Sequence, residues 1–416
     1  MALNAQERQI YWTSFAVRCF FGLTAWWIIN TFQIPLAEDP FYYKEMGQII
    51  AREWWQYGTS PTLQWAISAD RPWLIFVIIA GMTIIMGDFA AVPVLIVLFS
   101  FITSLAPVYT YRIAKELEIM PRAALFSARL VVFSPAFAFW GGFMAKDALV
   151  FIVMNLIVYH VLILQKKRRF KSILGLTLAM LALLILRFYL ATLLIPILAL
   201  TLLLKQRRQR YSLKVSPGGG GIGLTQIVVI LVVFALFTLA GVSKGIQRAV
   251  PESMDHFLQD MQDARNDAAA RGESGYLRGA DISTPKAAIR YLPVGVFYFL
   301  TVPHPWRLGS FRNNLAIIET LFWVLMYPAV LMGMRRGLRR NYPGAVLLIV
   351  IILAKIFLYS LASGNAGTAY RMRSQVWLFF AIFIGWYREK RYLQKIRKVS
   401  MVGRPTTAGE SNLESS

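Results

Sequence analysis

The sequence predicts an all-α polytopic membrane protein, with about ten transmembrane helices and further interfacial helices in the first extracytoplasmic loop. Of its 416 residues, 57% are hydrophobic and only 16% are charged, which is too apolar for a soluble fold of this size. Apolar runs of about 17–22 residues recur along the chain, and that length spans a bilayer. Several runs are followed by basic clusters, which set membrane topology.

The expected helices follow from the apolar stretches, which lie near 11–31, 73–87, 90–111, 123–144, 148–165, 172–186, 188–204, 223–242, 313–334, 344–362 and 375–387. By the positive-inside rule, the cytoplasmic ends are marked by the basic clusters at 166–169, 205–210, 335–340 and 388–398. Stretch 73–87 is only about 15 residues long, so we expect it to be interfacial or re-entrant. The remaining stretches then cross, and both termini are cytoplasmic.

This topology predicts one transmembrane domain over residues 1–396, with large extracytoplasmic loops at about 32–89 and 243–312. In the first loop, residues 41–57 have the spacing of an amphipathic helix that lies on the membrane. Residues 397–416 are polar and are expected to form a disordered cytoplasmic tail. The outer face then holds Glu38, Asp39, Asp70, Asp88, Lys146 and Asp147.

Composition also excludes several classes of protein. Cys19 is the only cysteine, so an intrachain disulfide is impossible and a thiol-based metal site is not expected. The three histidines are scattered and form no zinc pattern. The net charge of +23 comes from residues at helix ends, where they bind anionic lipids, so we expect no nucleic-acid partner.

Two acidic motifs on the outer face are candidates for chemistry. Glu38-Asp39-Pro40 follows the first span, and Lys146-Asp147 begins a later one. A carboxylate at such a place can act as a general base or hold a metal ion. It can also begin a helix, with Pro40 at the first helical position. Both interpretations stay open for Asp39 and for Asp147, and Lys146 can contact either a phosphate or lipid headgroups.

Arginines on the outer face are the second candidate set. Arg187 lies at a turn between two short spans, and Arg371 and Arg373 lie in the expected loop between the last two spans. The planar guanidinium recognises phosphate well, whereas the alternative is contact with lipid phosphates. Two other charges, Glu319 and Lys355, lie deep in adjacent expected spans, and we predict that they form an ion pair.

The motifs together resemble the GT-C superfamily of integral-membrane glycosyltransferases, more narrowly the bacterial relatives of protein O-mannosyltransferases and lipid A aminoarabinose transferases. The resemblance covers roughly residues 10–205 and 360–390. It maps the catalytic acid of the first loop onto Asp39, the charged-proline signature onto 70–72, and the second outer acid onto Asp147. Residues 365–373 are similar to a C-terminal loop of polysaccharide-associated relatives. Loop one has Glu38-Asp39-Pro40 where the family often has a fuller Asp-Glu pattern, and the family's outer C-terminal soluble domain has no counterpart.

The resemblance implies an inverting glycosyltransferase of the bacterial cytoplasmic (inner) membrane. It would move a sugar from a polyprenyl phosphate to a lipid, glycan or protein acceptor at the extracytoplasmic face, in cell-envelope or exopolysaccharide synthesis. Asp39 would be the base, with Glu38 and Asp147 orienting the acceptor, and whether Asp39 and Asp147 hold Mg or Mn is left open. Phosphate would be bound by Lys146, Arg187, Arg371 and Arg373. Sugar or acceptor contacts are expected from Tyr42, Asp70, Asn365 and Tyr370.

Two other functions stay open on the sequence. An O-antigen-type polymerase or ligase would use the outer arginines equally well, although the acidic motif of loop one fits it less well. A transporter of lipid-linked sugars would place charges near the bilayer midplane, as Glu319 and Lys355 are expected to lie.

Overall fold

The part of the chain that the computed structural model describes is mostly helical, and it comprises residues 3–32, 39–68, 73–143, 145–167, 169–203, 254–270, 274–306 and 311–402. Within these ranges there is no strand, and one isolated β-bridge joins Gly275 to Asn365. The helices in chain order are α1 (Ala5–Phe32), α2 (Asp39–Tyr57), α3 (Pro61–Ser68), α4 (Trp73–Met86), α5 (Asp88–Thr103), α6 (Leu105–Glu116), α7 (Pro121–Phe133), α8 (Pro135–Gly142), α9 (Lys146–Lys166), α10 (Phe170–Leu186), α11 (Phe188–Leu203), α14 (Met254–Ala270), α15 (Pro285–Thr301), α16 (Phe311–Arg340), α17 (Tyr342–Ala362) and α18 (Ala366–Val402).

The expected class, a polytopic α-helical membrane protein, is confirmed. Five stretches of the described residues are long and apolar enough to cross a membrane, namely Ala5–Phe32, Ala91–Glu116, Lys146–Lys166, Asn313–Arg340 and Tyr342–Ala362. The bent pair α7–α8 makes up to six, and the shorter apolar helices are Trp73–Met86, Phe170–Leu186 and Phe188–Leu202. The expected span 223–242 lies outside the described residues. Helix α18 stays helical to Val402, so the tail expected from residue 397 begins as part of this helix.

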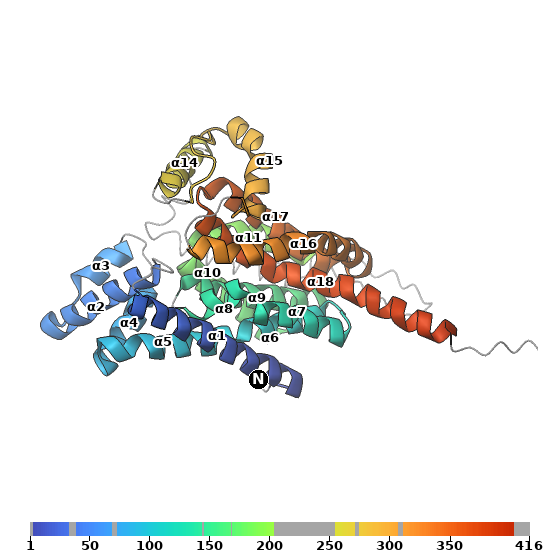
Figure 1. Cartoon of the computed structure of the whole chain (residues 1–416), viewed down its shortest axis with the longest axis horizontal. Coiled ribbons are helices and arrows are strands. Elements are labelled where there is room, and N and C mark those ends of the chain that lie inside the picture. Colours follow the sequence, from blue (N-terminus) through green and yellow to red (C-terminus); the bar gives the residue numbers. More distant parts are fainter. Residues whose placement is uncertain are drawn as a thin grey trace, which may run out of the picture.

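Helices α2, α3 and α4 form a unit at one end of the molecule (Figure 1). Helix α4 has 14 residues and a length of about 21 Å, short of the roughly 30 Å hydrocarbon layer. It packs closely on α2, because a Cβ added to Gly47 would lie 2.5 Å from Ile79 Cγ2. The corner between α2 and α3 is held by Glu53, which accepts hydrogen bonds from the Ser60 and Thr62 hydroxyls and from Thr62 N at 3.1 Å.

One expected span is broken where its sequence contains Ser134-Pro135. Proline disfavours α conformation in the residue before it, and Ser134 is extended, with φ −69° and ψ 123°. Helices α7 and α8 are therefore bent by 59°. Pro135 then begins α8, since the missing N–H is not needed at a first helical position.

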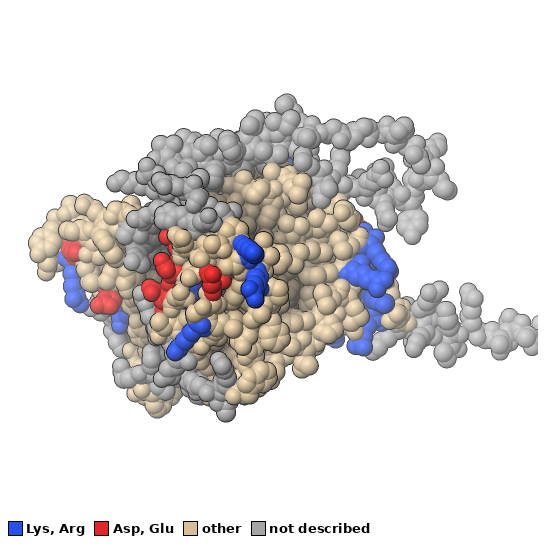
Figure 2. All heavy atoms as spheres, turned by 90° about the horizontal axis from the view of Figure 1, so that it is seen from above, with Lys and Arg blue, Asp and Glu red and all other residues tan. Residues whose placement is uncertain are grey.

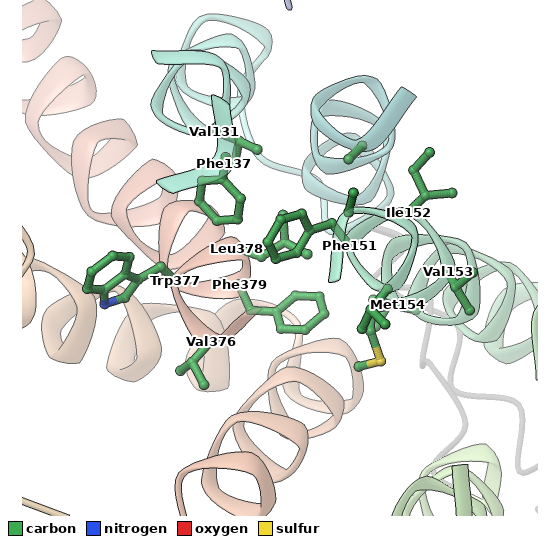
Figure 3. Close-up of a cluster of buried hydrophobic side chains, with 14 of the residues drawn as sticks. Val131, Phe137, Phe151, Ile152, Val153, Met154, Val376, Trp377, Leu378 and Phe379 are labelled. Atoms are coloured by element: carbon green, nitrogen blue, oxygen red, sulfur yellow. The ribbon is translucent and has the colours of Figure 1, made fainter. Parts of the chain in front are cut away.

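The core of the molecule lies between α7, α8, α9 and α18. Phe137 of α8 and Phe151 of α9 meet edge to face with ring centroids 5.1 Å apart. Leu378 and Phe379 of α18 extend toward Phe151 (Figure 3). All four side chains are fully buried. This packing fixes α8, the start of α9 and the start of α18 relative to one another.

Basic side chains gather at one end of the molecule, in a band at the right of Figure 2, while the acidic side chains in that view lie in the other half. At the basic end, Glu389 accepts from Arg336 at 3.0 Å and from Arg340, and it also accepts from Met120 N at 2.9 Å. Glu7 pairs with Arg112 at 2.8 Å. The expected topology depends on such an uneven distribution of basic residues between the two ends of the helices.

Candidate functional site: a buried acid among cations

Asp147 is the centre of the candidate site. It lies in the first turn of α9 and has no exposed surface. Its Oδ1 accepts from the Arg187 guanidinium and from Gln375 Nε2 at 2.9 Å, and its Oδ2 lies 3.3 Å from Arg371 Nε. The alternative prediction that Asp147 is the N-cap of this helix is wrong, because Ala145 is the N-cap and no side chain caps the helix.

The partners of Asp147 come from helices that are far apart in the chain. Arg187 ends α10 and sits before α11, where the backbone turns between two apolar helices. Arg371 and Gln375 are one helical turn apart on α18, so they share a face. Tyr359 of α17 donates its hydroxyl to Gln375 Oε1 at 2.9 Å. Four helices therefore hold one carboxylate.

Cations outnumber acids around Asp147. Arg187 and Arg371 contact it, and Lys146 and Lys355 lie close enough for charge interactions with it. Lys355 is completely buried on α17, and its ammonium has no hydrogen-bond partner among the described residues. Among the described residues these cations share one carboxylate, so this part of the cluster carries more positive than negative charge, which an anionic ligand would satisfy.

Three residues of this cluster and its surroundings keep donors without a described acceptor. Trp140 lies beneath Arg371, whose guanidinium carbon is 5.7 Å from the centre of the indole ring. The buried Trp140 Nε1 and Arg187 Nε, like Lys355 Nζ, find no acceptor within the described ranges. Buried donors normally have partners, and the oxygens of a bound phosphate are suitable ones.

Arg373 lies away from this cluster. The expected loop from 365 to 373 is in fact the start of α18, and Arg373 points to the other side of the helix from Arg371. Its buried guanidinium donates to Phe299 O at 2.8 Å, to Val302 O and to Thr320 Oγ1 at 2.9 Å. These bonds hold the end of α15 against α16 and α18, so the contacts of Arg373 stabilise helix packing.

Asn365 and Tyr370, two expected sugar contacts, also make intramolecular bonds. Asn365 Oδ1 accepts from Gly367 N at 2.8 Å and from Ser274 Oγ at 3.0 Å, which ties the chain before α15 to the start of α18. The Tyr370 hydroxyl donates to Glu319. Neither side chain is therefore placed beside Asp147 by these contacts.

The predicted ion pair between Glu319 and Lys355 is wrong. Glu319 accepts instead from Ser134, Trp323, Tyr370 and the amide of Ala136. Lys355 is on a neighbouring helix, but its charge interacts with Arg187 and Asp147. Adjacent spans do not determine which faces of two helices meet.

The acidic residues of the first loop are the next expected site residues. Asp39 is the first residue of α2, but its side chain, like Glu38 and Asp70, lies outside what the structure describes. Tyr42 is half-buried and packs edge to face on Phe76, with ring centroids 5.7 Å apart. The expected role of Tyr42 as a sugar contact thus competes with a packing role.

A small pocket lies directly beside the start of α2. It is lined by Trp26, Ile29 and Asn30 of α1, Phe41 and Lys44 of α2, Val92 of α5, and Phe143. Phe143 stacks on Phe139 of α8, with centroids 5.4 Å apart. The pocket therefore lies between the first turns of α2 and Phe143, the residue that follows α8.

The surroundings of Asp147 do not fit a divalent metal ion. Both carboxylate oxygens face guanidinium groups, and a metal would add positive charge where positive charge is already in excess. In the described ranges, no group of three or more His, Cys, Asp or Glu side chains is arranged to hold a metal.

Sequence reasoning missed Gln375, Tyr359 and Trp140. A signal existed for Gln375, since it is a polar residue in an apolar stretch, one turn after Arg371. The sequence carries no such signal for Tyr359 and Trp140, because aromatic residues are common near the ends of membrane spans.

Residues 70–240 match the family described as dolichyl-phosphate-mannose-protein mannosyltransferase. The match supports a membrane glycosyltransferase of the GT-C type. It covers less than half of the chain and includes Asp147 and Arg187, but neither Asp39 nor Arg371. A comparison with curated proteins finds no match. The family implies a sugar donor carried on a polyprenyl phosphate, in agreement with a site that has excess positive charge.

Proposed function

We propose that the protein is an inverting glycosyltransferase that moves a sugar from a polyprenyl-phosphate donor to an acceptor hydroxyl at the extracytoplasmic face. The observation that supports this most is the excess of cations over acids around Asp147 in the described part of the chain, where Trp140, Arg187 and Lys355 each keep a donor without a described partner. A lipid phosphate that lies in the membrane surface is an anion that reaches such a site from the bilayer.

In this proposal, Asp39 removes the proton of the acceptor hydroxyl, and the acceptor oxygen forms a bond to the anomeric carbon of the sugar. The bond from that carbon to the phosphate oxygen breaks, and its electron pair stays on the phosphate. Arg187, Arg371 and Lys355 stabilise the charge that develops there, assisted by Lys146 at the rim. Asp147 holds the two guanidinium groups in position.

We propose the sugar donor and the acceptor as chemical classes. The description of the matching family names mannose and a protein acceptor, so polyprenyl-phosphate mannose is the first donor to test. The basic band of Figure 2 supports a cytoplasmic location for that end of the molecule. Cytoplasmic termini and a bacterial inner membrane remain part of the proposal. Basic side chains there would also bind anionic lipids. A metal at Asp39 stays a proposal to test by chelation, and cell-envelope or exopolysaccharide synthesis is the proposed setting.

The experiment is a turnover assay in nanodiscs with a panel of polyprenyl-phosphate sugars, comparing wild type, Asp39→Asn and the control Glu45→Gln. Glu45 is an exposed acid on the same helix. We expect one donor to be consumed by wild type and by Glu45→Gln, and the rate to fall by about 10²–10⁴-fold in Asp39→Asn. Full activity of Asp39→Asn would remove Asp39 from the mechanism, and no consumption of any donor would reject the transferase.

A transporter of lipid-linked sugars is the second candidate, because the broken span at Ser134 and the buried charges Arg18 and Lys355 are typical of transporters. It would move the labelled donor across the bilayer of a vesicle without cleaving it. A polymerase or ligase would instead need two lipid-linked glycans as substrates. The same panel separates the three, since each predicts a different product.

A further inference from the structure

Helix α8 is an eight-residue half-helix (Pro135–Gly142) that carries part of the candidate site. Trp140 lies near its end, beneath Arg371, and Phe143 leads from it toward Asp147. The first amides of any helix lack partners within the helix. Ser134 precedes α8 but its side chain makes no capping bond to it. A cap must therefore come from elsewhere.

Glu319 of α16 supplies this cap. Glu319 is 5% exposed. Oε2 accepts from Ala136 N, in the first turn of α8, at 2.8 Å, and Oε1 accepts from the Ser134 hydroxyl. A negative charge at a helix N-terminus is stabilised by the helix dipole. Trp323 Nε1 donates at 3.2 Å.

The same carboxylate also holds the start of α18. The hydroxyl of Tyr370, the residue before Arg371, donates to Glu319 Oε2. Aromatic rings enclose the carboxylate: Trp323 and Trp377 stack with centroids 5.0 Å apart, and Tyr370 meets Trp377 edge to face at 5.7 Å. Excluding water strengthens the hydrogen bonds within such an enclosure.

Opposite charges thus lie at the two ends of α8. Arg18 of α1 is fully buried and runs along the C-terminal end, where a Cβ added to Gly141 would lie 2.5 Å from Arg18 Nε. A cation at a helix C-terminus is favourable, as an anion is at the N-terminus. Helix α8 is therefore clamped between α1 and α16, while Glu319 also links it to α18.

We propose that Glu319 is a positioning residue that sets the pairing of Trp140 with Arg371, and through it the geometry of phosphate binding. Glu319 touches neither Trp140 nor Arg371, and it acts through α8 on one and through Tyr370 on the other. The part that concerns phosphate rests on the proposed function.

The test compares Glu319→Gln with wild type and with Glu389→Gln. Glu389 is a matched control, because it is also a buried carboxylate that accepts from the N-terminal amide region of a helix, at Met120, but it lies at the basic end of the molecule. Hydrogen exchange of the peptide 135–143 reports on α8 and requires no activity. Binding of polyprenyl phosphate and the melting temperature are measured in the same nanodiscs.

We expect Glu319→Gln to speed exchange of α8 and to weaken polyprenyl phosphate binding, each by about tenfold, the scale of leaving one buried group unpaired. Glu389→Gln should lower the melting temperature and change neither quantity. Equal exchange and binding in Glu319→Gln and wild type, or equal changes in the two variants, would overturn the proposal.

Tyr370→Phe keeps the test decisive if Glu319→Gln does not fold. It leaves Glu319 on α8 and removes only the link to α18, so polyprenyl phosphate binding should weaken severalfold while α8 exchange changes little. Unchanged binding in this variant would contradict the positioning role. If the wild type binds no polyprenyl phosphate, the proposed function fails, and exchange of α8 alone decides whether Glu319 holds this helix.

Discussion

Replacing Asp147 by asparagine tests the charge imbalance of the site. The side chain keeps its shape and can still accept from Gln375, but Arg187 and Arg371 lose the negative charge that both contact. Removing one partner of a buried ion pair costs about 3–5 kcal/mol. Because the amide oxygen remains, we expect the lower end of this range, about 3 kcal/mol.

The assay is thermal unfolding in detergent, with and without saturating polyprenyl phosphate. A ligand at one hundred times its Kd adds about 2.7 kcal/mol. In Asp147→Asn the phosphate no longer competes with a carboxylate for the guanidinium groups, so the ligand should recover a larger part of the stability than it adds to wild type.

The matched control is Glu7→Gln, which breaks the buried pair with Arg112 at the basic end. It should also lower the melting temperature, and added phosphate should stabilise it no more than it stabilises wild type. The reasoning would be refuted if Asp147→Asn melted like wild type, or if phosphate shifted all three proteins equally.

Three further predictions follow from other described residues. Lys355→Met should raise stability by about 1–4 kcal/mol, since it removes a buried charge without a hydrogen-bond partner, yet weaken polyprenyl phosphate binding; a loss of stability in thermal unfolding would contradict this. Gly142→Ala should cost about 1–3 kcal/mol, because its Cβ would lie 2.3 Å from Arg18 O; an unchanged melting temperature would show that α1 and α8 separate freely. Partial burial of Glu53 opposes ionisation, but hydrogen bonds from the start of α3 outweigh it and lower its pKa below 4.5. These bonds are complete above that value and lost as pH falls through the lowered pKa. The protection of the amides at 60–63, corrected for the intrinsic pH dependence of exchange, should therefore fall only in acid, and it should become independent of pH in Glu53→Gln.

The sequence was sufficient to predict the membrane class and to place the main site residues at the same ends of their helices. Hydropathy finds the long spans, and the sign of the charges between them sets their direction. That parity argument placed Lys146, Asp147, Arg187 and Arg371 on one face, and the structure brings them together.

The angular position of residues on helices was beyond the same reasoning. Arg371 and Arg373 were expected in one flexible loop, but α18 begins at Ala366, and two residues differ by about 200° around a helix. One therefore faces Asp147, and the other faces the end of α15. Glu319 and Lys355 were paired for being on adjacent spans, although hydropathy contains no information on which helix faces meet.

The most direct test of the central claim is the binding of polyprenyl phosphate and of the free polyprenol to wild type and to Arg371→Met, in the same nanodiscs. The account predicts that wild type binds the phosphate at least about tenfold more tightly than the alcohol, as expected for a charge-assisted pair, and that Arg371→Met loses most of this difference. Equal binding of the two lipids by wild type, or an unchanged preference in Arg371→Met, would contradict a phosphate site at Asp147.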